Sequence, residues 1–244
     1  MYYNNGPYSG NRRGAFGASR YQYQPLQQGM QVQTGSLIAK VMGLMAFSFI
    51  FALIGTFIGS FVVIGIGTYL IVAIAGLVVL IALHFTIQRT PLNLILLYLF
   101  TFLEGMAISP IIGYYLATSP AILGEAFLIT ALTTLALSVY AWTTHRDFSR
   151  LGDYLFFGLI LLVVAGFAGL IFGGFSNLIV LIISVIGVAI FSGYVLFYVQ
   201  RAKYMADTLP NAIGLTVSLF ITVLNLFLYI LEILAILQGG GRRR

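Results

Sequence analysis

Glu104 is the side chain of this sequence best placed for proton or cation chemistry inside a membrane. It lies near the middle of an apolar stretch at residues 92–115. A charged residue at the centre of a bilayer costs about 2.5–3.5 kcal/mol on insertion scales, so its carboxyl should face protein or a water-filled cavity. We expect Glu104 either to attract cations and sense protons, or to remain protonated in a hydrogen bond to a neighbouring helix.

Ser109 and Pro110 interrupt the same apolar stretch shortly after Glu104. Because proline has no backbone N–H, Pro110 leaves the carbonyl of Met106 without its usual partner in the helix. A free carbonyl at membrane depth could coordinate a cation, or it could simply accompany a kink. Ser109 is therefore a candidate for an ion pathway that includes Glu104.

A polar stripe runs along the last apolar stretch, residues 211–237. At about 100° per residue, its polar and small residues fall within a face roughly 80° wide. They are Asn211, Gly214, Ser218, Thr222, Asn225 and Glu232. Unpaired polar groups cost several kcal/mol in hydrocarbon, so this face should turn away from lipid and the helix should lie inside a bundle. Asn225 and Glu232 are further candidates for the ion pathway, and Glu232 is close enough to the helix end to reach water or lipid head groups.

A second polar face is predicted on residues 177–199. Ser184, Gly187, Tyr194 and Tyr198 share one side of that helix, because they recur at helical spacing. We expect this face to pack on the stripe of residues 211–237. Tyr198 lies near one end of its helix, which also fits an ordinary tyrosine of the membrane interface.

The remaining residues do not indicate an enzyme. The chain has no cysteine and two histidines, and His84 and His145 lie too far apart, with too few carboxylates, to form a metal cluster or a catalytic dyad. We therefore expect no catalytic residue, no metal site and no cofactor. The net charge of +6 comes from tails and connections and indicates orientation in a membrane, so we expect no nucleic-acid partner.

The composition is that of an integral membrane protein. Of the 244 residues, 60% are hydrophobic and 7% are charged, and the mean hydropathy is +1.03, values that a water-soluble domain does not show. A spanning helix needs about 20 apolar residues, so the prediction is an all-α membrane protein with seven transmembrane helices. They are expected at residues 36–59, 62–85, 92–115, 121–143, 154–172, 177–199 and 211–237, between a disordered polar tail at 1–35 and a basic tail at 238–244.

Local signals add detail to this layout. Gly55 and Gly59 form a GxxxG pattern, which allows two membrane helices to pack closely. Lys40 lies one turn inside the first helix and could extend to the lipid head groups. Asp207 or Thr208, ahead of Pro210, is a suitable N-terminal cap for the last helix.

The positive charges predict the orientation. Arg89, Arg146, Arg150, Arg201 and Lys203 lie in alternate connections, on the same side as the basic N-terminal tail. This places the N-terminus in the cytoplasm and the chain in the cell (inner) membrane. Seven crossings would put the basic residues 242–244 outside, against the same rule. Either the last helix enters and returns without crossing, or its tail is an exception; its length favours a full crossing.

Three segments make the chain resemble the prokaryotic branch of the Bax inhibitor-1 family of seven-helix membrane proteins. Residues 143–149, Thr-Thr-His-Arg-Asp-Phe-Ser, are similar to a Thr-Lys-Arg-Asp-Leu-Ser type loop after the family's fourth helix. Residues 191–200 begin with Phe-Ser-Gly-Tyr and end with Gln, and residues 218–228 contain Ser-Leu-Phe and Asn-Leu-Phe-Leu. The resemblance covers residues 36–237 and rests on the order and spacing of these segments.

The resemblance implies a bundle with the seventh helix central, wrapped by the other six. It also implies a function, because several members are described as pH-dependent calcium leak pathways. In those members two aspartates, on the sixth and seventh helices, share a proton and hold the cytoplasmic gate. Here these positions hold Tyr198 and Thr222. Threonine does not titrate and tyrosine loses its proton only at high pH, so this pair can form at most a hydrogen bond and not a physiological proton switch.

Two functions of different classes follow. The first is a pH-influenced calcium or cation leak or transport pathway across the lipid bilayer, carrying Ca²⁺ or H⁺, with Glu104 as its titrating group. The second is a regulatory protein that binds and modulates a membrane AAA protease. The YccA-like branch of the family, known for that role, is similar in having Ser at the position of Thr222. A membrane protein whose ancestral channel function has decayed is a third alternative.

Overall fold

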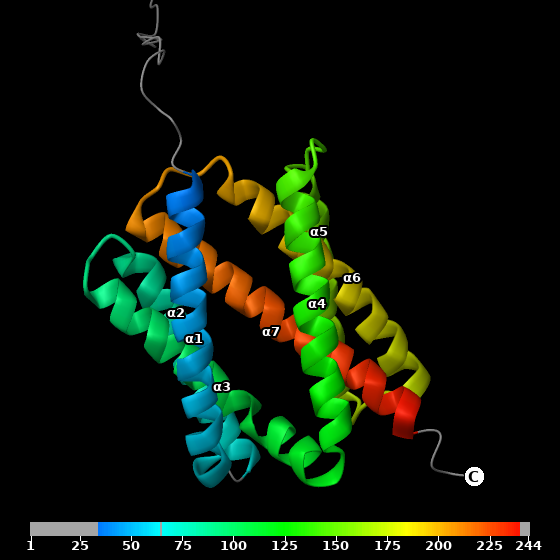
Figure 1. Cartoon of the computed structure of the whole chain (residues 1–244). Coiled ribbons are helices and arrows are strands. Elements are labelled where there is room, and N and C mark those ends of the chain that lie inside the picture. Colours follow the sequence, from blue (N-terminus) through cyan, green and yellow to red (C-terminus); the bar gives the residue numbers. More distant parts are fainter. Residues whose placement is uncertain (1–33, 64, 240–244) are drawn as a thin grey trace, which may run out of the picture. The chain divides into compact units, whose positions relative to one another are not determined.

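The computed structural model of the chain describes residues 34–63 and 65–239, and this part is helical apart from short connections (Figure 1). It contains seven helices, α1 (Thr34–Val62), α2 (Ile66–Thr86), α3 (Leu92–Thr118), α4 (Pro120–Thr143), α5 (Leu151–Ile171), α6 (Asn177–Ala202) and α7 (Leu209–Gly239). The predicted all-α membrane fold is confirmed. The predicted tails lie almost wholly outside the described residues.

Each of the seven helices is long and apolar enough to cross a membrane. The shortest have 21 residues and α7 has 31, against the roughly 20 that a crossing needs. In Figure 1, α7 runs obliquely past α1 and α4 as one continuous helix. An unbroken helix contains no reversal, so α7 is not a segment that enters the membrane and returns.

Helix ends differ from the predicted ones by a few residues. The break between α1 and α2 comes after Val62 instead of at Gly59, and α5 begins at Leu151. The break between α1 and α2 was missed because a uniformly apolar run gives no local signal for where a helix stops. The start of α5 lies three residues inside a polar run, which was assigned to the connection. At the start of α7 the Thr208 hydroxyl accepts a hydrogen bond from the backbone N–H of Asn211 at 3.3 Å, which confirms Thr208 as the cap.

α1 and α3 pack so closely that the glycines at their contact have no room for a side chain. A Cβ on Gly55 would lie 2.0 Å from the carbonyl oxygen of Phe102, and one on Gly105 would lie 2.0 Å from that of Ala52. The Thr56 hydroxyl lies 3.0 Å from the carbonyl oxygen of Gly105 and links the two helices. The GxxxG pattern on α1 is therefore a close-packing surface, as predicted.

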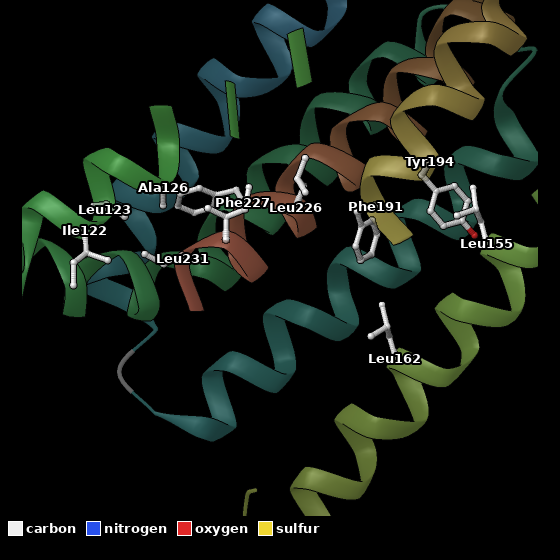
Figure 2. Packing of buried hydrophobic residues seen from close by; sticks show 11 residues of the cluster. Ile122, Leu123, Ala126, Leu155, Leu162, Phe191, Tyr194, Leu226, Phe227 and Leu231 are labelled. Atoms are coloured by element: carbon white, nitrogen blue, oxygen red, sulfur yellow. The ribbon is translucent and has the colours of Figure 1, made fainter. Parts of the chain in front are cut away.

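α7 is the most buried of the spans. In its most apolar stretch 44% of the residues are buried, compared with 11% in α5. It packs against α1, α3, α4 and α6, and Figure 2 shows its Phe227 beside Ala126 of α4. The expectation that α7 is central and wrapped by all six other helices is not confirmed, because the packing partners of α2 and α5 are chiefly α3 and α6.

The connections that carry basic residues lie at one end of the helices (Figure 1). Lys40 of α1 forms a salt bridge of 3.0 Å with Asp207 in the α6–α7 connection, so Lys40 has a protein partner in addition to any lipid contact. Gln200 of α6 accepts a hydrogen bond from the backbone N–H of Phe148 at 2.5 Å and donates to the carbonyl of Arg146. This glutamine fastens the α4–α5 connection to the end of α6.

Candidate functional site

A large cavity lies against the polar stripe of α7, between α2, α5, α6 and α7. Its volume is about 630 Å³. Its walls are mostly apolar, and its polar side chains come from three helices: His84, Tyr194, Tyr198, Ser218, Thr222 and Asn225. The two positions that correspond to the family's aspartate pair, Tyr198 and Thr222, thus face one shared space.

A smaller cavity of about 320 Å³ adjoins it toward the end with the basic connections. The two cavities share His84, Tyr198 and Ser218 among their lining residues. The smaller one also reaches Arg201 and Met205, at the end of α6. The polar space along α7 therefore extends to the end of the molecule that is predicted to be cytoplasmic.

A third cavity, of about 540 Å³, lies between the second halves of α3 and α7. Asn225 and Glu232 both line it, together with Tyr114, Tyr115 and Tyr229. Two of the predicted ion-pathway residues thus share one cavity. Asn225 also lines the large cavity, so it is the polar residue at which the two spaces meet.

The stripe of α7 presents acceptor oxygens to these cavities. The Ser218 hydroxyl donates to the carbonyl of Gly214 at 3.0 Å, and the Thr222 hydroxyl donates to that of Ser218 at 2.7 Å. The Asn225 amide Nδ2 donates to the carbonyl of Ile221 at 2.8 Å, which directs its Oδ1 elsewhere. The hydroxyl donors of Ser218 and Thr222 and one of the two amide N–H groups of Asn225 are used within the helix, so both hydroxyl oxygens and the Asn225 Oδ1 keep acceptor lone pairs, the groups that bind cations.

Tyr198 and Thr222 are not joined by a hydrogen bond, although sequence reasoning allowed one. Thr222 donates within its own helix, and the Tyr198 ring stacks on Tyr194 with 5.5 Å between ring centroids. The substituted pair therefore forms an aromatic and hydroxyl surface of the cavity.

The polar faces of α6 and α7 meet, as predicted. The buried Ser184 hydroxyl donates to Glu232 Oε2 at 2.5 Å, which holds the carboxyl of α7 against α6. One turn further along α6, a Cβ on Gly187 would lie 2.6 Å from the ring of Tyr229. Gly187 therefore allows the Tyr229 ring to pack directly on α6.

Glu104 and Ser109 lie apart from these cavities. The Glu104 carboxyl lies beside α2, where a Cβ on Gly76 would be 3.5 Å from Oε1, and Glu104 lines none of the three cavities. The expected free carbonyl of Met106 is a wrong prediction. The Ser109 hydroxyl donates to it at 2.7 Å, so the serine supplies the bond that Pro110 cannot make.

The structure adds His84 and Arg201, which sequence reasoning did not single out as cavity residues. In the sequence, each is only a polar residue near the end of an apolar helix, and such a residue fits an anchor at the membrane interface equally well. Within residues 34–63 and 65–239, no group of three metal-binding side chains occurs. His84 and His145 belong to different elements, α2 and the α4–α5 connection.

The α4–α5 connection is ordered by its own polar contacts. The backbone N–H of Ser149 donates to Asp147 Oδ1 at 2.8 Å, and this bond together with the Ser149 side chain keeps the pKa of Asp147 below its usual range. The Lys203 ammonium lies 5.5 Å from the centroid of the Trp142 ring, a distance at which cation–π attraction acts. Two of the motif segments, residues 143–149 and 191–200, are in direct contact through the hydrogen bonds of Gln200 to Arg146 and Phe148.

Comparison with known proteins gives consistent matches over the whole described region. A family model described as "Inhibitor of apoptosis-promoting Bax1" matches residues 34–239. A protein of Campylobacter jejuni is 34% identical over 211 residues, covering 86% of this chain and 87% of its own. A membrane protein of Vibrio cholerae is 31% identical over 194 residues, covering 77% and 85%. Mouse protein lifeguard 4 is 31% identical over 160 residues, covering 65% of this chain and 63% of its own.

Proposed function

This chain belongs to the Bax inhibitor-1 family, and we propose that it forms a passive pathway for cations across the membrane, along the polar face of α7. The observation that carries the proposal is the position of Asn225. It lines the large cavity, which continues toward the basic connections, and it lines the cavity of Glu232 on the other side. A single side chain thus lies between two spaces that approach the two ends of α7.

The chemistry of the stripe favours cations over anions. Ser218 and Thr222 use their hydroxyl donors, and Asn225 one of its two N–H donors, on backbone carbonyls of α7, so the side-chain oxygens are left as acceptors for a permeating ion. Hard cations such as Ca²⁺ take hydroxyl, amide and carboxylate oxygens as ligands. Glu232 adds a carboxylate at one end of the path. Because these ligands are few and mostly neutral, an ion should bind weakly enough to leave again.

The test is calcium-dye flux into proteoliposomes for Asn225→Leu. Leucine has nearly the shape of asparagine but no acceptor oxygen. An ion would then meet hydrocarbon at position 225, between the two cavities, so we expect flux to fall at least about tenfold. Thr130→Val is the matched control: Thr130 also donates to its own helix, to Ala126 at 2.7 Å, and lines none of the three cavities. It should conduct as the wild type does. A wild-type flux equal to that of empty liposomes would contradict the proposal.

Glu104 remains the predicted titrating group, and Glu104→Gln tests it in the same assay. Flux measured between about pH 6 and pH 8 should lose its pH dependence in this variant while conduction persists. An unchanged pH dependence would assign the titration to another group. His84 and Glu232, which line the cavities, would then be the residues to substitute.

A second candidate is a regulatory role through binding of a membrane AAA protease. Two observations favour it: both positions of the aspartate pair carry uncharged residues, and α5 packs chiefly against α6, which leaves Phe157 and Leu161 exposed. Because lipid covers an exposed apolar face equally well, co-purification from native membranes is needed to show whether a protease binds it. Failure to recover a protease reproducibly, with the full chain or with a chain lacking residues 1–34, removes this candidate.

A further inference from the structure

The cavity between α3 and α7 contains more aromatic surface than a path for inorganic ions requires. Tyr114 and Tyr115 of α3 and Tyr229 of α7 line it beside the carboxylate of Glu232. A carboxylate among tyrosine rings is the arrangement by which proteins hold ammonium groups, through charge pairing and cation–π attraction. We propose that this cavity is a binding site for an organic ammonium cation, with a quaternary ammonium group as the fitting class of ligand.

The tyrosines are held in place by their packing. The rings of Tyr114 and Tyr115 meet edge to face, with 5.1 Å between centroids and an angle of 84°. The ring of Tyr229 stacks on Phe191 with 5.8 Å between centroids and lies over Gly187, where a Cβ would be 2.6 Å away. Because Tyr229 is packed against α6 before a ligand arrives, binding does not require ordering this side chain.

The charge of the cavity suits a cation. Glu232 is the charged residue of its lining, and no Lys, Arg or His is among the described lining residues. Its Oε2 accepts the hydrogen bond from Ser184, which fixes the carboxyl and leaves Oε1 for a ligand. Asn225 adds an amide oxygen, since its Nδ2 donates to Ile221. An ammonium group there meets a carboxylate without a competing positive side chain in the lining.

The volume of this cavity and its distance from the helix ends indicate which ligands could occupy it. The volume of about 540 Å³ lies within the range of small-molecule sites and exceeds what a hydrated metal ion needs. At about 1.5 Å per residue, Tyr115 lies roughly 5 Å from the end of α3 and Glu232 roughly 10 Å from the end of α7. A site this close to two helix ends is within reach of lipid head groups as well as of water, so the ammonium could come from a lipid head group or from a soluble cation. The inference does not depend on ion conduction, because binding can occur without transport.

Choline and its neutral isostere test the proposal on the full-length protein in a maltoside detergent. Calorimetric titration with choline chloride should show binding, and 3,3-dimethylbutan-1-ol, which has the same shape without the charge, should bind at least about tenfold more weakly. Glu232→Gln, which keeps an oxygen for Ser184, should weaken choline binding at least about tenfold. Tyr114→Leu, a change at an exposed ring, should weaken it about three- to tenfold.

A control variant separates the Glu232 charge from the general charge of this end of the protein. Glu125→Gln removes a nearby carboxylate that bonds Gln238 at 2.7 Å and lies outside the cavity lining; it should bind choline as the wild type does. Absence of choline binding, equal binding of the isostere, or wild-type affinity in Glu232→Gln would each overturn the proposal.

Choline binding to the protein in nanodiscs of two lipid compositions distinguishes a lipid head group from a soluble ammonium cation. If phospholipid head groups occupy the cavity, choline should bind more weakly in phosphatidylcholine nanodiscs than in phosphatidylglycerol nanodiscs, because the lipid competes for Glu232. Equal choline affinity in both membranes would identify a soluble ammonium cation as the ligand.

Discussion

Ser109 compensates within one turn for a backbone bond that Pro110 removes. Its hydroxyl lies 2.7 Å from the Met106 carbonyl oxygen, and Ser109 is almost completely buried. A carbonyl left unpaired in the membrane costs more than a hydrogen bond normally contributes, because no water can replace the partner. Ser109 therefore has a structural role in α3 that its sequence position alone does not reveal.

A double-mutant cycle at this position checks the compensation. Ser109→Ala should lower the stability of the protein in detergent by about 1 kcal/mol, since it orphans the Met106 carbonyl. In Ser109→Ala combined with Pro110→Ala, the new N–H at residue 110 can make the bond, so most of this loss should be recovered. Thermal unfolding of the four variants measures the coupling, and strictly additive effects would contradict the compensation.

At the scale of the helices, the α1–α3 contact depends on glycine at specific positions. Gly55 and Gly105 each bring backbone carbonyls of the neighbouring helix within 2.0 Å of where a Cβ would be. Those contacts involve backbone atoms, which cannot move aside as a flexible side chain can. The contact is therefore a rigid unit of the fold, and α2 packs on its α3 side.

Gly105→Ala should separate α1 from α3. We expect a loss of about 2–3 kcal/mol, at the upper end for overpacking, because the clash is with the carbonyl of Ala52. Gly43→Ala is the matched control on α1, since a Cβ there has nothing within 4 Å; it should be neutral or slightly stabilising, as alanine favours helix. Thermal unfolding compares the two, and similar stabilities would show that the helices can move apart at little cost.

At the scale of the whole molecule, charge and polarity divide between the two ends of the helices. Lys40, Arg146 and Arg201 lie at the end with the α2–α3, α4–α5 and α6–α7 connections, where the Lys40–Asp207 ion pair and the Gln200 contacts join the segments. Glu125 and Glu232 lie toward the opposite end, on α4 and α7. The positive-inside rule then predicts a cytoplasmic location for the basic end.

Cysteine labelling tests this orientation without background, because the chain has no native cysteine. Ser149→Cys, in the α4–α5 connection, should react with a membrane-impermeant maleimide only after the cells are opened. Ser176→Cys, in the α5–α6 connection, should react in intact spheroplasts. The reverse pattern would invert the predicted topology.

The sequence by itself determined the number of helices, their approximate ends, the close-packing glycines of α1 and the polar faces of α6 and α7. These are local properties, because apolar length and helical period depend only on neighbouring residues. Only the tertiary structure decided that Asn225 lies between two cavities, that Glu232 is held by Ser184 among tyrosines, and that Glu104 lies beside α2 away from both cavities. These neighbours depend on the tilt and rotation of each helix. Tilt and rotation are set by the packing of all the helices together, and the hydrophobic period of a single helix does not determine them.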